Sequence, residues 1–275
     1  MKRKTIAKEI STEGIGLHKG QNIKLRLLPA NDGHVLFRRT DLKAGENEVS
    51  LDLANTFDLT RGTNLKNPYG AAVYTIEHFL SSLMAAGITD LVVELDGNEL
   101  PIGDGSASGF LALYEKAGIR ELEAEADPLV ITSPVYLRQD DKMVAAFPWE
   151  GFKITYAIRF ERSWLQSELA EFEIDYETYK KEIAPARTFG FDYEIDYLKK
   201  NHLALGGSLE NAIVITKEGV MNPEGLRFPD EFVRHKMLDI IGDLKILNRP
   251  IRGHIVAIKA GHAIDIAFAE KLRAL

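Results

Sequence analysis

The stretch FPDEFVRHKMLDIIGDLKIL, residues 228–247, decides the predicted fold, because its apolar residues recur at the spacing of a helix and form a wide apolar stripe. His235, Asp239 and Asp243 follow one another at intervals of four, so they share one helical face beside that stripe. A neutral histidine and an ionised aspartate one turn apart can hold a divalent metal from the same side. The alternative is an ordinary hydrogen-bonded helix pair, and a metal would need a further ligand from elsewhere in the chain.

A second helix is predicted at residues 73–87, VYTIEHFLSSLMAAG, where apolar residues again lie on one face and Gly87 provides a stop signal. Glu77 and His78 are neighbours in this helix and therefore point about 100° apart. His78 can supply the missing metal ligand, and Glu77 can then reach a water at the same metal. Taken alone, this helix favours the plainer interpretation, in which Glu77 is partly exposed and His78 lies at the edge of the core.

Composition limits the classes of protein that this chain can belong to. Its 275 residues suffice for one large or two medium domains, and a net charge of −7 argues against nucleic-acid binding. Because the chain has no cysteine, His and carboxylate groups must hold any metal, which favours a catalytic over a structural zinc site. The N-terminal stretch MKRKTIAKEI lacks the long apolar run of a signal peptide, and no apolar run reaches the roughly 20 residues needed to cross a bilayer, so a cytoplasmic protein is predicted.

The order of the predicted elements indicates two copies of one α+β unit. A helix, a strand and a Gly-containing turn follow one another around His78, with the strand at residues 91–95, and again around His235, with the strand at residues 255–259. The charged stretch RELEAEADP, residues 120–128, is broken by proline and is the best candidate for a linker. The predicted domains are therefore residues 1–126 and 127–275. Other elements are predicted at residues 110–117 and 193–200 (helices) and at residues 129–137, 153–160 and 212–215 (strands).

A catalytic site follows if the two predicted helices face each other. His78, His235 and Asp239 then supply three ligands and leave one metal position for water, as in a hydrolytic zinc site. Glu77 is the candidate general base for that water. His262, in a predicted Gly-rich turn at the end of a strand, is the candidate general acid for the leaving amine.

Two charged residues complete this hypothesis. Asp243, one turn beyond Asp239, can hold His262 as an imidazolium ion. Lys236, adjacent to His235, can supply positive charge to an oxyanion.

Six motifs resemble those of the UDP-3-O-acyl-N-acetylglucosamine deacetylases, the zinc enzymes that catalyse the committed step of the lipid A pathway. In chain order they are IEHFLSSLMAAGI, ELPIGDGSASGF, ARTFGF, LGGSLENAIV, LRFPDEFVRHKMLDIIGDL and KAGHA. The resemblance extends from GIGLHKG near the N-terminus to GHAID near the C-terminus, and so covers essentially the whole chain. It implies an α+β fold of two similar β-α-α-β domains, each a sheet layered with helices, with the active site at their interface.

The resemblance also implies the chemistry. Zinc, or alternatively Fe²⁺, is bound by His78, His235 and Asp239, with Glu77 as the general base and His262 as the general acid. The implied reaction is hydrolysis of the N-acetyl group of UDP-3-O-acyl-N-acetylglucosamine, which releases acetate and UDP-3-O-acyl-glucosamine. The implied partner is therefore an acylated UDP-sugar, with no nucleic acid, and the chain is expected to be a monomer.

The resemblance also implies roles for further residues. Asp243 pairs with His262, while Thr188 and Lys236 polarise the carbonyl or bind the oxyanion. An insert at about residues 191–215 resembles the family's apolar tunnel for the acyl chain, for which plain core packing is the alternative. Phe160 matches the position that stacks on uracil. The other candidates for substrate binding are His18, Phe189, Phe191, Ile195, Leu203, Gly207, Ser208, Ala212 and Val214.

Two alternatives remain open. One is another zinc amidase that acts on a nucleotide sugar without a long acyl chain. The other is a binding protein that uses the metal for stability or for ligand capture. Glu77 distinguishes the second, because a purely structural metal site has no use for a carboxylate beside the open position.

Overall fold

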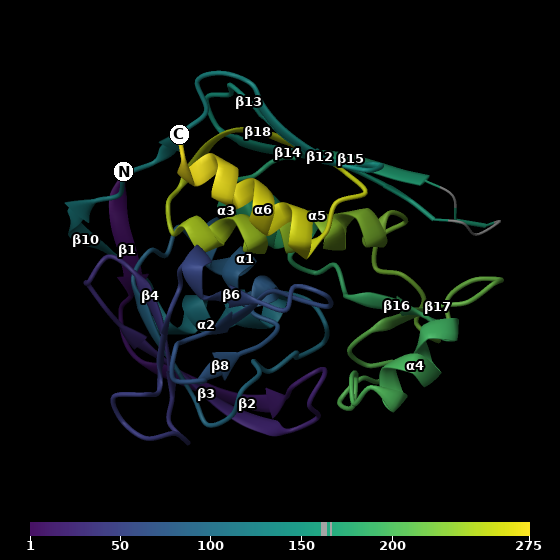
Figure 1. Cartoon of the computed structure of the whole chain (residues 1–275), viewed down its shortest axis with the longest axis horizontal. Coiled ribbons are helices and arrows are strands. Elements are labelled where there is room, and N and C mark those ends of the chain that lie inside the picture. The colour runs from purple at the N-terminus through teal and green to yellow at the C-terminus, as the bar shows by residue number, and fades with distance from the viewer. Residues whose placement is uncertain (161–163, 166) are drawn as a thin grey trace.

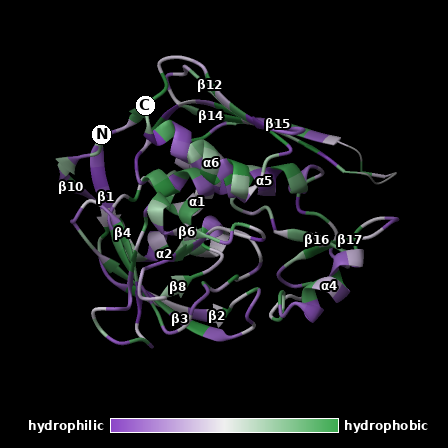
Figure 2. Cartoon of the chain, in the orientation of Figure 1, coloured by the Kyte–Doolittle hydropathy of each residue, from purple (hydrophilic) through white to green (hydrophobic). Residues whose placement is uncertain are grey.

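The computed structural model describes residues 1–160, 164–165 and 167–275. Two sheets enclose a layer of helices, with the strands of the first sheet in the lower half of Figure 1 and those of the second along its top. The helices α1 (Glu77–Ala86) and α5 (Glu231–Leu244) lie between them and pack against each other. Figure 2 shows hydrophobic residues along α1 and hydrophilic residues along the outer strand β1 (Lys2–Ile6).

The first sheet has the strand order β2-β3-β9-β4-β5. Only the β4/β9 pair is parallel in it, and the other three pairs are antiparallel. Alternate residues of β3 are buried, as expected for a strand with one face toward the helices. The helix α2 (Ser108–Ala117) follows β9. The strands are β2 (Ile10–Ile15), β3 (Asn22–Pro29), β4 (Val35–Arg39), β5 (Glu48–Ser50) and β9 (Leu91–Leu95).

The second sheet repeats this topology strand for strand. Its order is β12-β13-β18-β14-β15, and again only one of these pairs, β14/β18, is parallel. The helix α5 precedes β18 and α6 (His262–Arg273) follows it, as α1 and α2 do for β9. The short strand β11 (Leu129–Val130) adds to β18 in parallel. The strands are β12 (Val135–Gln139), β13 (Lys142–Phe147), β14 (Phe152–Arg159), β15 (Ser167–Glu173) and β18 (Ile251–Ile258).

Smaller elements complete the described chain. In the insert, at the right of Figure 1, the strands β16 and β17 pair in parallel, and α4 lies between them in the sequence. The small elements are β6 (Thr56–Phe57), β7 (Asn64–Lys66), β8 (Ala72–Val73), β16 (Phe189–Phe191), β17 (Ile213–Ile215), α3 (Tyr176–Thr178), α4 (Ile195–Lys200) and the short helical turns Leu53–Asn55, Tyr179–Ile183, Asp192–Glu194 and Lys245–Leu247. Among the described residues, no helix combines the length and apolar character that a membrane crossing requires.

The mixed α and β fold class is confirmed, but several local predictions are wrong. The stretch predicted as a linker is largely the strand β10 (Ile119–Glu125), which pairs antiparallel with β1. The predicted strand at residues 129–137 is two strands, because Pro134 between them has no N–H group for a sheet. The helix predicted from residue 73 begins at Glu77, because residues 72–73 form β8. The domain boundary at residues 126–127 stays a prediction, and it falls between β10 and β11.

His262 also differs from its predicted setting. It is the first residue of α6 rather than part of a Gly-rich turn, and this helix was not predicted. The helix packs against α5, so it presents His262 to the face that carries Asp243.

The crossing of α1 and α5 depends on a glycine. A Cβ atom on Gly242 would lie 2.0 Å from the Glu77 carbonyl oxygen, which is far too close for two non-bonded atoms. Glycine therefore sets how closely the two helices, and with them the site residues, approach each other.

We expect Gly242→Ala to lower the free energy of unfolding by about 1–3 kcal/mol, because overpacking forces the helices apart. Gly109→Ala is the matched control, since Gly109 lies in α2 and its Cβ would have nothing within 4 Å. That change should be neutral or stabilise by about 0.5–1 kcal/mol. Urea unfolding measures both, and equal effects of the two substitutions would contradict the close-crossing explanation.

Candidate active site

Three potential metal ligands meet where α1 and α5 cross. His78 lies in the first turn of α1, and His235 and Asp239 lie one turn apart on α5. Their ligand atoms all lie within 4.8 Å of one another, and all three residues are buried. Asp239 Oδ1 is 3.7 Å from His78 Nε2 and 3.4 Å from His235 Nε2. The two imidazole rings are perpendicular, with their centroids 4.8 Å apart.

This group fits a divalent cation. The Ala186 carbonyl can only accept a hydrogen bond, so the His235 Nδ1 atom 3.1 Å away carries a proton and Nε2 has a free lone pair. Burial lowers the pKa of His78 to about 3, which keeps that ring neutral as well. Asp239 Oδ1 is buried and has no hydrogen-bond partner among the described residues. A carboxylate oxygen in that position is costly without a cation, and two His and one Asp are ligands that Zn²⁺ accepts.

The contacts of Asp239 extend to Lys236. The Lys236 ammonium group donates to Asp239 Oδ2, which leaves Oδ1 toward the two histidines. Burial alone would raise the pKa of Asp239, but the positive charge of Lys236 and the charges of three nearby histidines together outweigh it and hold that pKa below its ordinary value. Asp239 is therefore an ionised candidate ligand.

Glu77 lies next to His78, at the first position of α1. The backbone N–H of Thr63 donates to Glu77 Oε2 at 2.8 Å and so fixes the carboxylate. Burial raises the pKa of Glu77 to about 7. A carboxyl group that titrates near neutral pH is well suited to accept and return a proton.

His262, Asp243 and Thr63 form a hydrogen-bonded chain beside the group. His262 Nδ1 lies 2.9 Å from Asp243 Oδ2, and the Thr63 hydroxyl donates to Asp243 Oδ1. Burial alone would lower the pKa of His262, but the charge and hydrogen bond of Asp243, together with the charges of Glu77 and Asp239, outweigh it and raise that pKa to about 10. Thr63 thus contacts both Glu77 and Asp243. Sequence reasoning missed this residue, because a lone Thr before β7 has no regular spacing to either partner.

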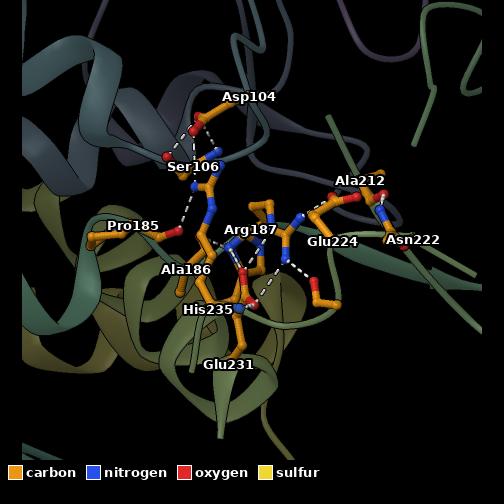
Figure 3. A network of polar contacts seen from close by, with 12 residues as sticks. Asp104, Ser106, Pro185, Ala186, Arg187, Ala212, Asn222, Glu224, Glu231 and His235 are labelled. Atoms are coloured by element: carbon orange, nitrogen blue, oxygen red, sulfur yellow. Dashed lines mark hydrogen bonds and ion pairs between the residues drawn. The ribbon is translucent and has the colours of Figure 1, made fainter. Parts of the chain in front are cut away.

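A network of polar contacts surrounds Arg187, close to Ala186 and His235 (Figure 3). Arg187 is 2% exposed and pairs with Glu231, the first residue of α5, at 2.9 Å. It also pairs with Glu224 at 2.6 Å and donates to the Gly225 carbonyl at 2.7 Å. Because Arg187 follows Ala186 in the chain, this network fixes the carbonyl that accepts from His235.

One cavity of about 700 Å³ connects the His-His-Asp group, His78, His235 and Asp239, with the insert. Glu77, Lys236 and His262 line it together with the three candidate ligands. Of the residues predicted to bind substrate or carbonyl, those that line it are His18, Thr188, Phe189, Phe191, Ile195, Gly207, Ser208, Ala212 and Val214. The cavity wall also includes three cations that sequence reasoning missed, Arg61, Lys142 and Lys199.

Three predicted site residues lie outside this lining. Asp243 is fully buried behind His262. Leu203 is half-buried in the insert. Phe160 packs edge-to-face against Phe189 and two further phenylalanine rings, with centroid distances of 5.8–5.9 Å. Its stacking on uracil stays a prediction.

The fold and site together define a class of protein. A buried His-His-Asp group opens into a substrate-sized cavity that is also lined by the Glu77 carboxylate and by His262, which Asp243 holds. These are the components of a metal-dependent hydrolase.

Comparison with known proteins gives the family. Residues 3–274 match the family model LpxC, UDP-3-O-acyl N-acetylglycosamine deacetylase. A UDP-3-O-acyl-N-acetylglucosamine deacetylase of Syntrophotalea carbinolica is 44% identical over 98% of this chain and 87% of its own length. Proteins of the same name from Neisseria meningitidis serogroup B (44%, 97% and 88%) and Leptospira biflexa (40%, 98% and 88%) are also similar. The chain belongs to the UDP-3-O-acyl N-acetylglycosamine deacetylase family, and it is an amide hydrolase.

Proposed function

We propose that this protein hydrolyses the N-acetyl group of UDP-3-O-acyl-N-acetylglucosamine at a Zn²⁺ site formed by His78, His235 and Asp239. The products are acetate and UDP-3-O-acyl-glucosamine, and the reaction is the committed step of lipid A biosynthesis. The observation that carries the proposal is the single cavity that joins the His-His-Asp group to the apolar insert. The names of the relatives supply the substrate.

The divalent cation, when bound, polarises the amide carbonyl and makes a water molecule easier to deprotonate. Glu77 accepts the proton of the attacking water, and the Thr63 N–H holds its carboxylate in place. His262 donates a proton to the leaving amine through Nε2, because its Nδ1 is engaged by Asp243. Lys236 and Thr188, which both line the cavity, are placed to stabilise the oxyanion.

The cavity also suits the two ends of the substrate. The insert contributes apolar walls from Ile195, Ala212 and Val214, which fit an acyl chain. Arg61 and Lys142 line the same cavity and offer positive charge to a diphosphate. The cytoplasmic location and the monomeric state stay predictions.

If the insert holds the acyl chain of the substrate, a bulky side chain introduced there should block binding of that chain. We expect Ala212→Trp to lower kcat/KM for the acylated UDP-sugar by roughly 10- to 200-fold, as the loss of a well-filled apolar pocket does in other enzymes. The rate with UDP-N-acetylglucosamine, which has no acyl chain, should change much less. Tyr197→Ala is the control, since Tyr197 lies on α4 and is 58% exposed. Equal wild-type rates with acylated and non-acylated substrates would remove the tunnel assignment.

A second prediction concerns pH. His262 must be protonated to act as an acid, so activity is lost as the pH rises through its raised pKa of about 10. We therefore expect the alkaline limb of kcat/KM to lie well above the ordinary histidine value of about 6.5. Asp243→Asn removes the charge that raises this pKa and should move the limb downward. Identical limbs in the wild type and this variant would show that another group is the acid.

A further inference from the structure

Asp265 is a buried acid that the mechanism above does not use. It lies on α6, three residues after His262, and it is fully buried. Neither of its carboxyl oxygens receives a hydrogen bond from the described residues. An ionised carboxylate without donors is strongly disfavoured in such surroundings, so this group is expected to carry a proton and to seek an acceptor.

The groups that face Asp265 identify the acceptor. From α5 they are Asp243 and Lys236, from its own helix His262, and from β14 the hydroxyl of Tyr156. Asp243 is the candidate acceptor by position, because it contacts His262, which lies one helical turn before Asp265 on α6. Lys236 is already paired with Asp239.

Asp243 is suited to accept this proton. It already takes hydrogen bonds from Thr63 at Oδ1 and from His262 at Oδ2, so it is the ionised member of the pair. Two carboxyl groups in contact share a proton rather than both ionise. Burial, followed by the charge of Asp243, raises the pKa of Asp265 well above its ordinary value.

We propose that Asp265 is a neutral carboxylic acid that donates its O–H to Asp243 and thereby acts as a positioning residue for His262. Asp243 then accepts from three donors on three different segments, Thr63, His262 and Asp265. Its carboxylate is fixed in orientation, and His262 is fixed with it. The positioning role rests on the proposed function of His262, whereas the protonation of Asp265 does not.

The protonation is tested on the metal-loaded full chain with Asp265→Asn. Asparagine keeps the shape and a donor but cannot titrate. If folded Asp265 holds a proton that the unfolded chain releases, the folded-to-unfolded ratio of the wild type falls about tenfold per pH unit relative to the variant as the pH rises above about 5. The infrared carbonyl band of a protonated carboxylic acid should also be present in the wild type and absent from this variant. Glu270→Gln, which removes an exposed carboxylate from the same helix, is the control.

The positioning role is tested by pH–rate profiles. Asp265→Asn should keep the alkaline limb of kcat/KM at the wild-type position, because its amide donates to Asp243 as the acid does. Asp265→Leu, which has no donor, should lower kcat and move that limb.

Several results would overturn the inference. A stability ratio that does not change with pH, together with no infrared band, would show that Asp265 is ionised. An alkaline limb that shifts downward in Asp265→Asn would show the same, since a negative charge beside His262 would have been lost. A band with no effect of Asp265→Leu on the profile would remove the positioning role. If no deacetylase activity appears at all, the proposed function fails while the stability and infrared results still decide the protonation.

Discussion

Replacing Glu77 by glutamine is expected to lower kcat by roughly 10²–10⁴-fold, the usual contribution of a positioned general base. The amide oxygen can still accept the Thr63 N–H bond that holds this side chain, so the fold and the cavity should be retained. Glutamine cannot take a proton from water, and the loss should therefore appear in kcat rather than in KM. Because Glu77 is not one of the three grouped ligands, the metal content should equal that of the wild type.

Glu115→Gln is the matched control for this experiment, since Glu115 is an exposed carboxylate on α2 that pairs with Lys180. Its kcat should equal that of the wild type. A Glu77→Gln enzyme with full turnover would show that the base is another group. If no turnover appeared in any variant or in the wild type with metal bound, the binding-protein alternative would be preferred.

Removing a candidate metal ligand should lower turnover more than Glu77→Gln does. We expect His78→Ala and Asp239→Ala each to lower metal affinity by more than about 100-fold, because even indirect partners of metal ligands contribute 10–100-fold. Turnover should fall to background for the same reason. His34→Ala is the control, because His34 lies before β4, outside the cavity lining.

The same variants give a readout that does not depend on activity. A ligand that binds only the folded state stabilises it in proportion to the logarithm of its concentration over Kd. Added Zn²⁺ should therefore raise the unfolding midpoint of the wild type and of His34→Ala, but not that of His78→Ala or Asp239→Ala. Equal stabilisation of all four proteins would place the bound metal elsewhere.

Sequence patterns predicted best the elements whose apolar residues are buried. The apolar residues of α5 are buried in the middle layer, and alternate residues of β9 in the first sheet are buried as well. The helix α6 was missed because Ile264, Ile266 and Phe268 alternate with small or polar residues, which is the period of a strand. Tertiary packing outweighs this local pattern, because the segment forms a helix that packs against α5 and the second sheet and buries all three side chains.

The strand β10 was mistaken for a linker for a different reason. It pairs only with β1, and its residues are exposed on both faces apart from Leu122, so no alternation of apolar and polar residues is needed. Its charges instead make surface contacts, such as the ion pair of Lys2 with Glu125 at 3.1 Å. Backbone pairing alone defines such a strand, and side-chain patterns do not reveal it.

The candidate site was predictable where its residues share one helix. The spacing of His235 and Asp239 indicates a ligand pair. The partnership with His78 requires two distant segments to pack, so the sequence predicted it only on the assumption that the two helices face each other, and the resemblance to a family supported that assumption. Thr63 and Asp265 could not be found in this way. Both act through contacts between segments that are remote in the chain, and neither stands at a regular interval from its partners.

A crystal of the wild-type protein grown with Zn²⁺ tests the central claim most directly, with anomalous scattering to locate the ion. One ion is expected at about 2.0–2.2 Å from His78 Nε2, His235 Nε2 and Asp239 Oδ1. Glu77 should then lie beside the remaining coordination position. An ion bound elsewhere, or a structure in which His78 lies far from His235 and Asp239, would contradict the account.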